Sequence, residues 1–221
     1  MGDFFLHKSI VNLNLIKEDL KSKINNYQNI KVIAVSKTFS MEAIMPLIEY
    51  GHLEYGENKV QEAITKWTDI KLANPNIKLH LIGKLQTNKV KFALKLFDYI
   101  HSVDTKKLAK KIAEEEVKQN KKIKIFLQVN IGNEEQKSGI NKNNLNDFYL
   151  YCKNLNLDVV GLMCIPPADD QSENFFKEMA LLNKKLNLLE LSMGMSSDYI
   201  EAAKNSATYL RIGSNIFGKR S

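Results

Sequence analysis

The sequence alternates between short strand-like runs and helical runs from end to end, and this alternation restricts the fold more than any other feature. Several of the strand-like runs are apolar without a break, as expected for strands that helices cover on both faces. The eight predicted strands span residues 31–36, 52–55, 78–82, 99–103, 124–129, 159–163, 189–192 and 209–212. Eight such units predict an α/β fold, a single (β/α)8 TIM-like barrel.

An extra N-terminal helix is predicted before the first strand, at about residues 8–26. Its apolar residues recur at helical spacing, so we expect this helix to pack on the outside of the barrel. No linker or low-complexity tract divides the sequence, and residues 1–221 are predicted to form one domain. An open doubly wound sheet is the alternative, but no G-x-G-x-x-G motif follows the first strand.

The charge and the cysteines narrow the class of protein. The net charge is +7, yet only Arg211 and Arg220 among the 32 basic residues are arginine, and the lysines are scattered. A nucleic-acid partner is therefore not expected. No apolar run is long enough for a membrane span, and the first residues do not resemble a signal peptide. We therefore expect no membrane partner. Cys152 and Cys164 form no C-x-x-C motif, so we expect a cytoplasmic protein in which both thiols are buried.

Lys37 is the first candidate site residue, because functional residues of a barrel lie just after the strands. It follows the apolar run Val32–Val35. If Ile33 and Val35 face the barrel interior, Lys37 does so too, since side chains alternate along a strand. An amine at this position is suited to form a Schiff base with an aldehyde. The alternative is a lysine that extends to water at the barrel mouth.

Arg211 is the second candidate, because it lies inside the last predicted strand between Leu210 and Ile212. A buried guanidinium is costly unless a partner accepts its hydrogen bonds. The ring nitrogen of bound pyridoxal 5′-phosphate (PLP) is one such partner. A carboxylate from another strand, such as Asp104, is the alternative.

The segments 192–198 and 212–218 follow the seventh and eighth predicted strands, where barrels often hold a phosphate group. Ser196 and Ser214 offer hydroxyl groups, and Gly213 allows the backbone to approach an anion. Glycine and serine are also common in simple turns, which is the alternative reading. Together with Lys37, however, the two segments indicate an aldehyde ligand that carries a phosphate. The four histidines show no metal-binding spacing, and His80 and His101 are expected in the core or wall of the barrel.

Several motifs carry a resemblance to a known family: VIAVSKT (32–38), YGENKVQEA (55–63), LHLIGKLQTNK (79–89), LSMGMSSD (191–198) and RIGSNIFG (211–218). In this order the chain resembles the pyridoxal phosphate homeostasis proteins. The resemblance implies one barrel similar to the N-terminal domain of alanine racemase. It further implies PLP as cofactor, with a Schiff base on Lys37, Arg211 near the ring nitrogen, Asn58 near the cofactor, and the phosphate at Ser196, Gly213 and Ser214.

The resemblance implies a role in intracellular PLP homeostasis, as a carrier or regulator without catalytic turnover. A PLP-dependent amino-acid racemase is the alternative. In the racemases that the chain resembles, a tyrosine from a second domain serves one face of the cofactor, and the absence of that domain here favours the carrier. The resemblance leaves open whether apo-PLP enzymes receive the cofactor. The chain departs from the family at Ser206-Ala207-Thr208, where Gly-Ser-Thr is usual, and the segment 130–140 fits loosely, so no function is assigned to Lys137.

Overall fold

A computed structural model describes residues 6–167 and 172–218 of the chain. Within these residues, parallel strands pair in the order β1 to β8 and β8 pairs with β1, which closes a barrel. The strands are β1 (Lys31–Val35), β2 (Glu54–Glu57), β3 (Lys78–Leu81), β4 (Tyr99–Val103), β5 (Lys124–Val129), β6 (Asp158–Cys164), β7 (Glu190–Ser192) and β8 (Tyr209–Ile212). The predicted (β/α)8 barrel is confirmed, and the open doubly wound sheet is wrong.

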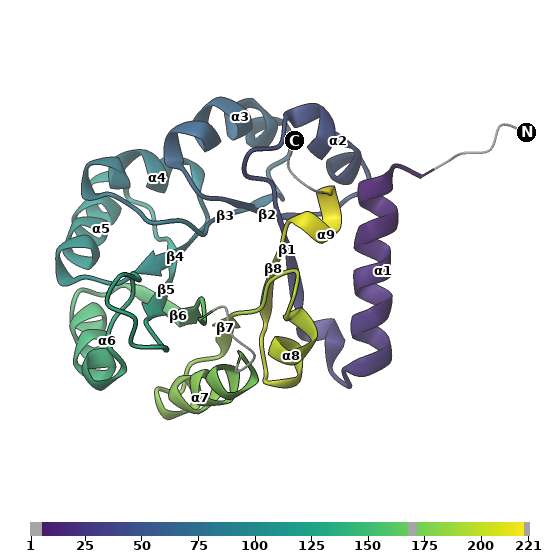
Figure 1. Cartoon of the computed structure of the whole chain (residues 1–221). Helices are drawn as coiled ribbons and strands as arrows, with labels where there is room; N and C mark the ends of the chain where they lie inside the picture. Colours follow the sequence, from purple (N-terminus) through teal and green to yellow (C-terminus); the bar gives the residue numbers. More distant parts are fainter. Residues whose placement is uncertain (1–5, 168–171, 219–221) are drawn as a thin grey trace, which may run out of the picture.

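Helices surround the ring of strands (Figure 1). They are α1 (Lys8–Lys23), α2 (Met41–Glu49), α3 (Val60–Ala73), α4 (Val90–Leu96), α5 (Lys106–Gln119), α6 (Leu145–Asn154), α7 (Ser172–Lys185), α8 (Tyr199–Lys204) and α9 (Ser214–Phe217). The predicted extra helix is α1, which lies outside the barrel beside α2, α8 and α9. It ends at Lys23 rather than near residue 26, because Ile24 already has extended backbone angles.

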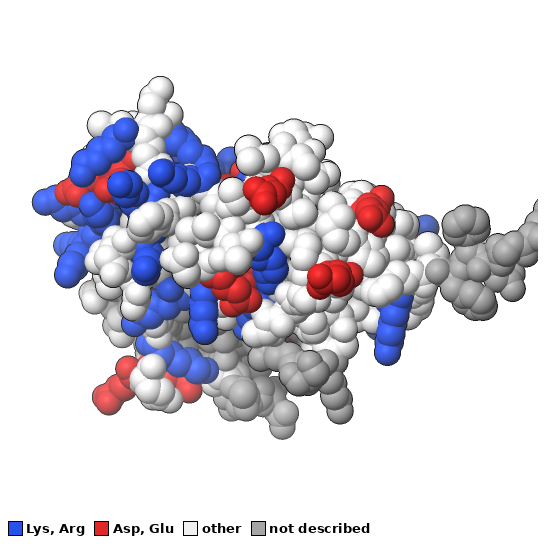
Figure 2. All heavy atoms as spheres, turned by 90° about the horizontal axis from the view of Figure 1, so that it is seen from above, with Lys and Arg blue, Asp and Glu red and all other residues white. Residues whose placement is uncertain are grey.

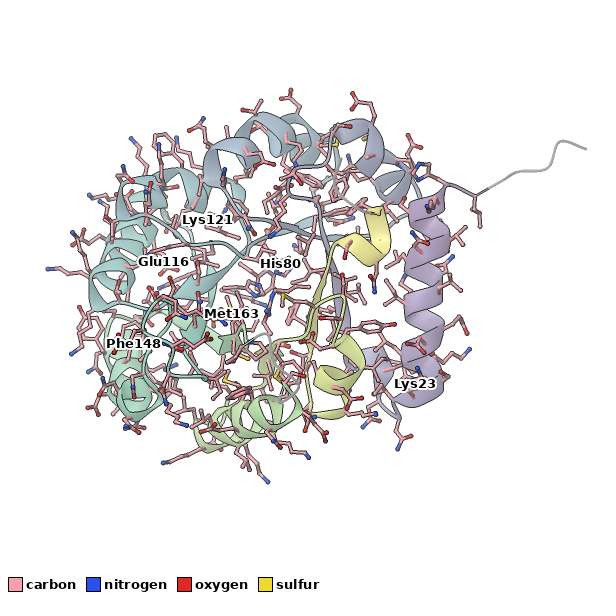
Figure 3. All side chains as sticks on the ribbon, in the orientation of Figure 1. Lys23, His80, Glu116, Lys121, Phe148 and Met163 are labelled. Carbon is pink, nitrogen blue, oxygen red and sulfur yellow. The ribbon has the colours of Figure 1, made fainter. Side chains whose placement is uncertain are left out.

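Two separate apolar clusters stabilise the barrel. The larger cluster lies between the strands and the helices and includes Leu13, Trp67 and Phe176, all with no exposed surface. The smaller cluster fills the inside of the ring and consists of Ile33, Val35, Tyr99, Phe126, Met163 and Tyr209. Figure 3 shows Met163 and His80 within the ring of strands. Ile33 and Val35 therefore face the interior, as the alternation along the first strand predicts.

The second strand was placed two residues too early by the sequence pattern. We predicted residues 52–55, whereas β2 spans Glu54–Glu57 and pairs with β3 through Glu57 and Leu81. Glu57 is a charged residue type that normally lies at the surface, but its side chain is fully buried here. Its carboxylate has an ion-pair partner in Lys66, so a strand can continue through a residue type that normally lies in loops.

The surface charge is distributed unevenly. Figure 2 shows lysines gathered at one end of the displayed face and acidic side chains spread over much of the rest. On α5, Glu115 pairs with Lys111 and Lys118, so part of the positive charge of this helix is locally balanced. Among the helices of residues 6–167 and 172–218, none has both the length and the apolar character required to span a membrane.

Candidate functional site

A cavity of about 880 Å³ opens at the carboxyl ends of the strands. All six residues that we predicted for the site line it: Lys37, Asn58, Ser196, Arg211, Gly213 and Ser214. Lys84 and Lys137 line it as well, and no aspartate or glutamate of the described residues does. A cavity lined by four cationic side chains without an acidic one favours an anionic ligand.

The strand β1 directs Lys37 into this cavity, and the turn that follows is held by buried polar contacts. The Glu57 carboxylate accepts hydrogen bonds from Ser36 Oγ at 2.7 Å and from Trp67 Nε1 at 2.9 Å. The same Oε1 atom lies 2.8 Å from Lys66 Nζ. Glu57 is fully buried and the Lys66 side chain is only 10% exposed, so this cluster is shielded from water. Such a charge-assisted cluster restricts the backbone beside Lys37.

Lys66 also fixes the turn from the other side. Its ammonium group donates to the carbonyl oxygens of Ser36, at 2.9 Å, and Phe39, at 3.2 Å. Between them, Thr38 has a φ of 68°, an uncommon value for a residue with a branched side chain. The backbone N–H of Thr38 donates to Glu62 Oε1 at 2.9 Å. The structure therefore holds a strained turn in one conformation immediately after the candidate lysine.

Arg211 forms the floor of the cavity from β8 and is almost fully buried. Its Nη1 donates to Ser192 Oγ at 2.8 Å, and its Nη2 donates to the carbonyl oxygen of Cys164 at 2.8 Å. Burial lowers the pKa of the guanidinium, which nonetheless stays charged at neutral pH. No carboxylate of the described residues forms an ion pair with it.

The alternative that Asp104 pairs with Arg211 is wrong. Asp104 Oδ2 accepts a hydrogen bond from the backbone N–H of Gly139 at 3.2 Å instead. Burial raises the pKa of this carboxyl group. A guanidinium has more N–H groups than the two that Arg211 uses. No other described residue accepts a hydrogen bond from the remaining N–H groups of Arg211, so these groups are left as donors for a ligand in the cavity.

The loops after β7 and β8 meet at the cavity. Asn215 joins them, because its Nδ2 donates to the carbonyl oxygen of Ser196 at 2.8 Å. Gly194 has a φ of 87°, and a Cβ atom there would lie 2.5 Å from Ala202 Cβ, so a side chain is excluded. At Gly213 a Cβ atom would lie 3.3 Å from the carbonyl oxygen of Val35, which leaves the backbone accessible on the cavity side.

Among the cavity-wall residues that were missed or left without a function are Gln128, Lys84 and Lys137. Gln128 lies inside β5, two residues after the interior residue Phe126, so its side chain faces the same side of the strand. A polar residue within an otherwise apolar strand was the signal that could have identified it. Lys84 follows β3, and the sequence analysis assigned it no role. Lys137 lies in the loop after β5, where it pairs with Glu134 at 2.5 Å and donates to the carbonyl oxygen of Pro166 at 3.2 Å.

The predicted burial of two histidines is confirmed. His80 and His101 are fully buried inside the barrel. Within the described part of the chain, no group of three or more His, Cys, Asp or Glu residues is arranged to hold a metal ion.

Comparison with known proteins identifies the family. The family model of the alanine racemase N-terminal domain matches residues 11–221. The pyridoxal phosphate homeostasis protein of Aquifex aeolicus is 38% identical over 200 residues, covering 86% of this chain and 87% of the relative. That of Haemophilus influenzae is 35% identical and covers 95% of this chain and 94% of its own length. The chain belongs to the pyridoxal phosphate homeostasis protein family.

Solved structures of similar proteins have the same barrel fold as this chain. PipY of Synechococcus elongatus PCC7942, determined with PLP bound, has a TM-score of 0.84 and 32% identity, and the match covers 95% of this chain and all of PipY. Alanine racemase of Clostridium difficile has a TM-score of 0.73 at 15% identity, and the match covers 56% of its chain. This second likeness shows the shared barrel fold alone.

Proposed function

We propose that this member of the pyridoxal phosphate homeostasis family binds PLP in the 880 Å³ cavity, linked to the amine of Lys37. The observation that carries the proposal is the convergence of Lys37, Arg211 and the two Ser/Gly loops on one cavity without an acidic lining residue among the described ones. The family's relatives carry the name of this cofactor, and PipY was crystallised with it.

The residues of the cavity fit the three chemical parts of PLP. The aldehyde of the bound cofactor supplies an electrophilic carbon, and Lys37 supplies the amine that forms the C=N bond with loss of water. Arg211 has N–H donors left for the ring nitrogen. Ser196, Gly213 and Ser214 supply hydroxyl and backbone groups for the phosphate, and Asn58 completes the wall on the β2 side.

Borohydride reduction tests this proposal directly, because it converts a reversible C=N bond into a stable one. Purified protein is incubated with PLP, reduced, digested and analysed by mass spectrometry. The expected adduct is on Lys37. An adduct confined to another lysine, or equal affinity for pyridoxal and PLP, would contradict the proposed arrangement.

We further propose that the chain stores or hands over PLP and does not use it for catalysis. A racemase needs an acid or base on each face of the bound substrate, whereas this barrel offers Lys37 on one side of the cavity and no tyrosine among the described lining residues. The cofactor-loaded protein is incubated with a panel of L- and D-amino acids, and racemization, decarboxylation and transamination are followed. Turnover that exceeds that of free PLP and depends on Lys37 would establish the racemase-type alternative instead.

A further inference from the structure

A continuous hydrogen-bond chain runs through the inside of the barrel, from the amino ends of the strands to the floor of the cavity. We call it the Glu54–Arg211 chain. Glu54 Oε2 lies 2.6 Å from His80 Nε2, and His80 Nδ1 lies 2.9 Å from His101 Nε2. His101 Nδ1 lies 2.9 Å from Ser192 Oγ, which accepts from Arg211 Nη1 at 2.8 Å. The chain draws on β2, β3, β4, β7 and β8.

The end groups fix the direction of every hydrogen in the chain. Arg211 can only donate, so Ser192 Oγ accepts from it and has its own O–H left for His101 Nδ1. His101 must then carry its proton on Nε2 and donate to His80 Nδ1. His80 likewise carries its proton on Nε2 and donates to the carboxylate of Glu54. Both histidines are neutral in this arrangement. The opposite direction would put the proton of a neutral His80 on Nδ1, so that its Nε2 lone pair would face the Glu54 carboxylate with no hydrogen between them.

The packing inside the barrel holds both imidazole rings in this orientation. His80 stacks on Tyr99 with ring centroids 4.4 Å apart and planes inclined by 13°. His101 stacks on Phe126 at 4.2 Å and 26°. Figure 3 shows the His80 side chain enclosed by the ring of strands. Neither ring can turn without losing a stacking partner as well as two hydrogen bonds.

The two ends of the chain differ in charge and in exposure. The Glu54 side chain is 20% exposed at the amino end of β2, whereas Arg211 is buried at the cavity floor with no carboxylate of the described residues paired to it. A row of aligned hydrogen bonds between a cation and an anion is polarised from one end to the other, which stabilises both charges in a medium of low dielectric constant. The chain thus supplies the buried guanidinium with an indirect acidic partner.

We propose that the Glu54–Arg211 chain fixes the position and the charge of Arg211 for contact with the ring nitrogen of PLP. Ser192, His101, His80 and Glu54 are then positioning residues for cofactor binding, although Glu54 lies at the opposite end of the barrel from the cavity. This inference rests on the proposed PLP site. It adds that residues outside the cavity determine the strength of the contact between Arg211 and the ring nitrogen.

The test compares PLP with its deaza analogue, in which a C–H group replaces the ring nitrogen. Dissociation constants for both ligands are measured for the wild type, Ser192→Ala and Glu54→Gln. The wild type is expected to prefer PLP by roughly tenfold or more, the range for a charge-assisted hydrogen bond. Each substitution should weaken PLP binding by about threefold or more and leave the affinity for the deaza analogue unchanged.

Tyr209→Phe is the matched control. Tyr209 lies in the same interior cluster, and its hydroxyl accepts from Lys31 Nζ at 2.7 Å without belonging to the chain. This variant should keep the wild-type preference for PLP. If Ser192→Ala and Glu54→Gln weaken both ligands equally, the chain has only a structural role and the inference is overturned. Unchanged affinity for both ligands in both variants overturns it too.

A second measurement separates this inference from the proposed function. Long-range ¹H–¹⁵N spectra of the ligand-free protein report the tautomer of each histidine, and both His80 and His101 should be neutral with the proton on Nε2. An Nδ1–H tautomer for either residue refutes the chain whether or not PLP binds. Conversely, Nε2–H tautomers in a wild-type protein that fails to bind PLP would overturn the proposed function and the role toward the ring nitrogen, while the direction of the chain stands.

Discussion

Acidification below the ordinary histidine pKa should destabilise the ligand-free protein strongly, because three of its histidines are buried. Burial is the main cause that lowers the pKa of His52, to about 4, and nearby Lys17 adds to it. Burial also lowers the pKa of His101 well below its usual value, with His80 and Arg211 acting in the same direction. The pKa of His80 is lowered by burial too, although its hydrogen bond to Glu54 opposes the shift.

The sign and the size of the effect follow from proton linkage. Below pH 6.5 the unfolded chain binds protons on these histidines that the folded protein does not bind, so the free energy of unfolding falls as the pH falls. Each such histidine costs about 1.4 kcal/mol per pH unit, and between pH 7 and pH 5 this amounts to about 2 kcal/mol for one residue. His52 and His101 together therefore cost about 4 kcal/mol over this interval. His80 adds less than about 2 kcal/mol, because Glu54 favours its charged form.

Urea unfolding followed by circular dichroism at several pH values between 7 and 5 measures this loss. The variant His52→Gln should reduce the loss by about 2 kcal/mol, whatever its stability at neutral pH. His7→Asn is the control, since His7 is exposed at the start of α1 and asparagine can also cap a helix. A loss below about 1 kcal/mol in the wild type, or an undiminished loss in His52→Gln, would refute the assignment of neutral buried histidines.

Four further substitutions make predictions, three of them at the cavity and one at Lys66 beside it. Lys37→Ala should abolish the borohydride-stable PLP adduct while the circular dichroism spectrum stays unchanged, and a persisting adduct would show that another amine is the main site. Gly213→Val should weaken PLP binding by roughly tenfold or more, because its side chain would press on Val35 and displace the cavity wall, whereas Ser214→Ala should cost only a few-fold by titration. Lys66→Met should lower the free energy of unfolding in urea by about 3–5 kcal/mol, since it leaves the buried Glu57 carboxylate without its cation, and a loss under about 1 kcal/mol would contradict a buried ion pair.

The residues that the sequence revealed are those whose chemistry conflicts with their local pattern. Lys37 follows an apolar strand, and Arg211 interrupts one, so each was noticed without knowledge of its neighbours. Their common cavity followed from a single rule, that the carboxyl ends of barrel strands meet. Glu57 shows the limit of the approach, because a buried carboxylate reads as a loop residue until its partners Trp67 and Lys66 are known.

Partnerships across the barrel could not be predicted in the same way. His80 and His101 were expected in the core or wall, but their order in a chain depends on which atoms face one another when the ring closes. Ser192 reads as an ordinary turn residue at the end of β7, and only the structure shows that it lies between His101 and Arg211. Pattern and propensity act over a few residues, whereas these contacts join residues up to 91 positions apart.

The direction of the Glu54–Arg211 chain bears on what the cavity can do with PLP. Because Arg211 only donates hydrogen bonds, a ring nitrogen in contact with it must accept one and so carries no proton. A ring without that proton withdraws electrons less strongly, which limits carbanion chemistry on a bound amino group. The chain reinforces this state, since Glu54 stabilises the charged guanidinium from the far end of the barrel. On the proposed binding mode, the same arrangement would strengthen the hold on the cofactor and weaken its reactivity, which supports the proposed storage of PLP.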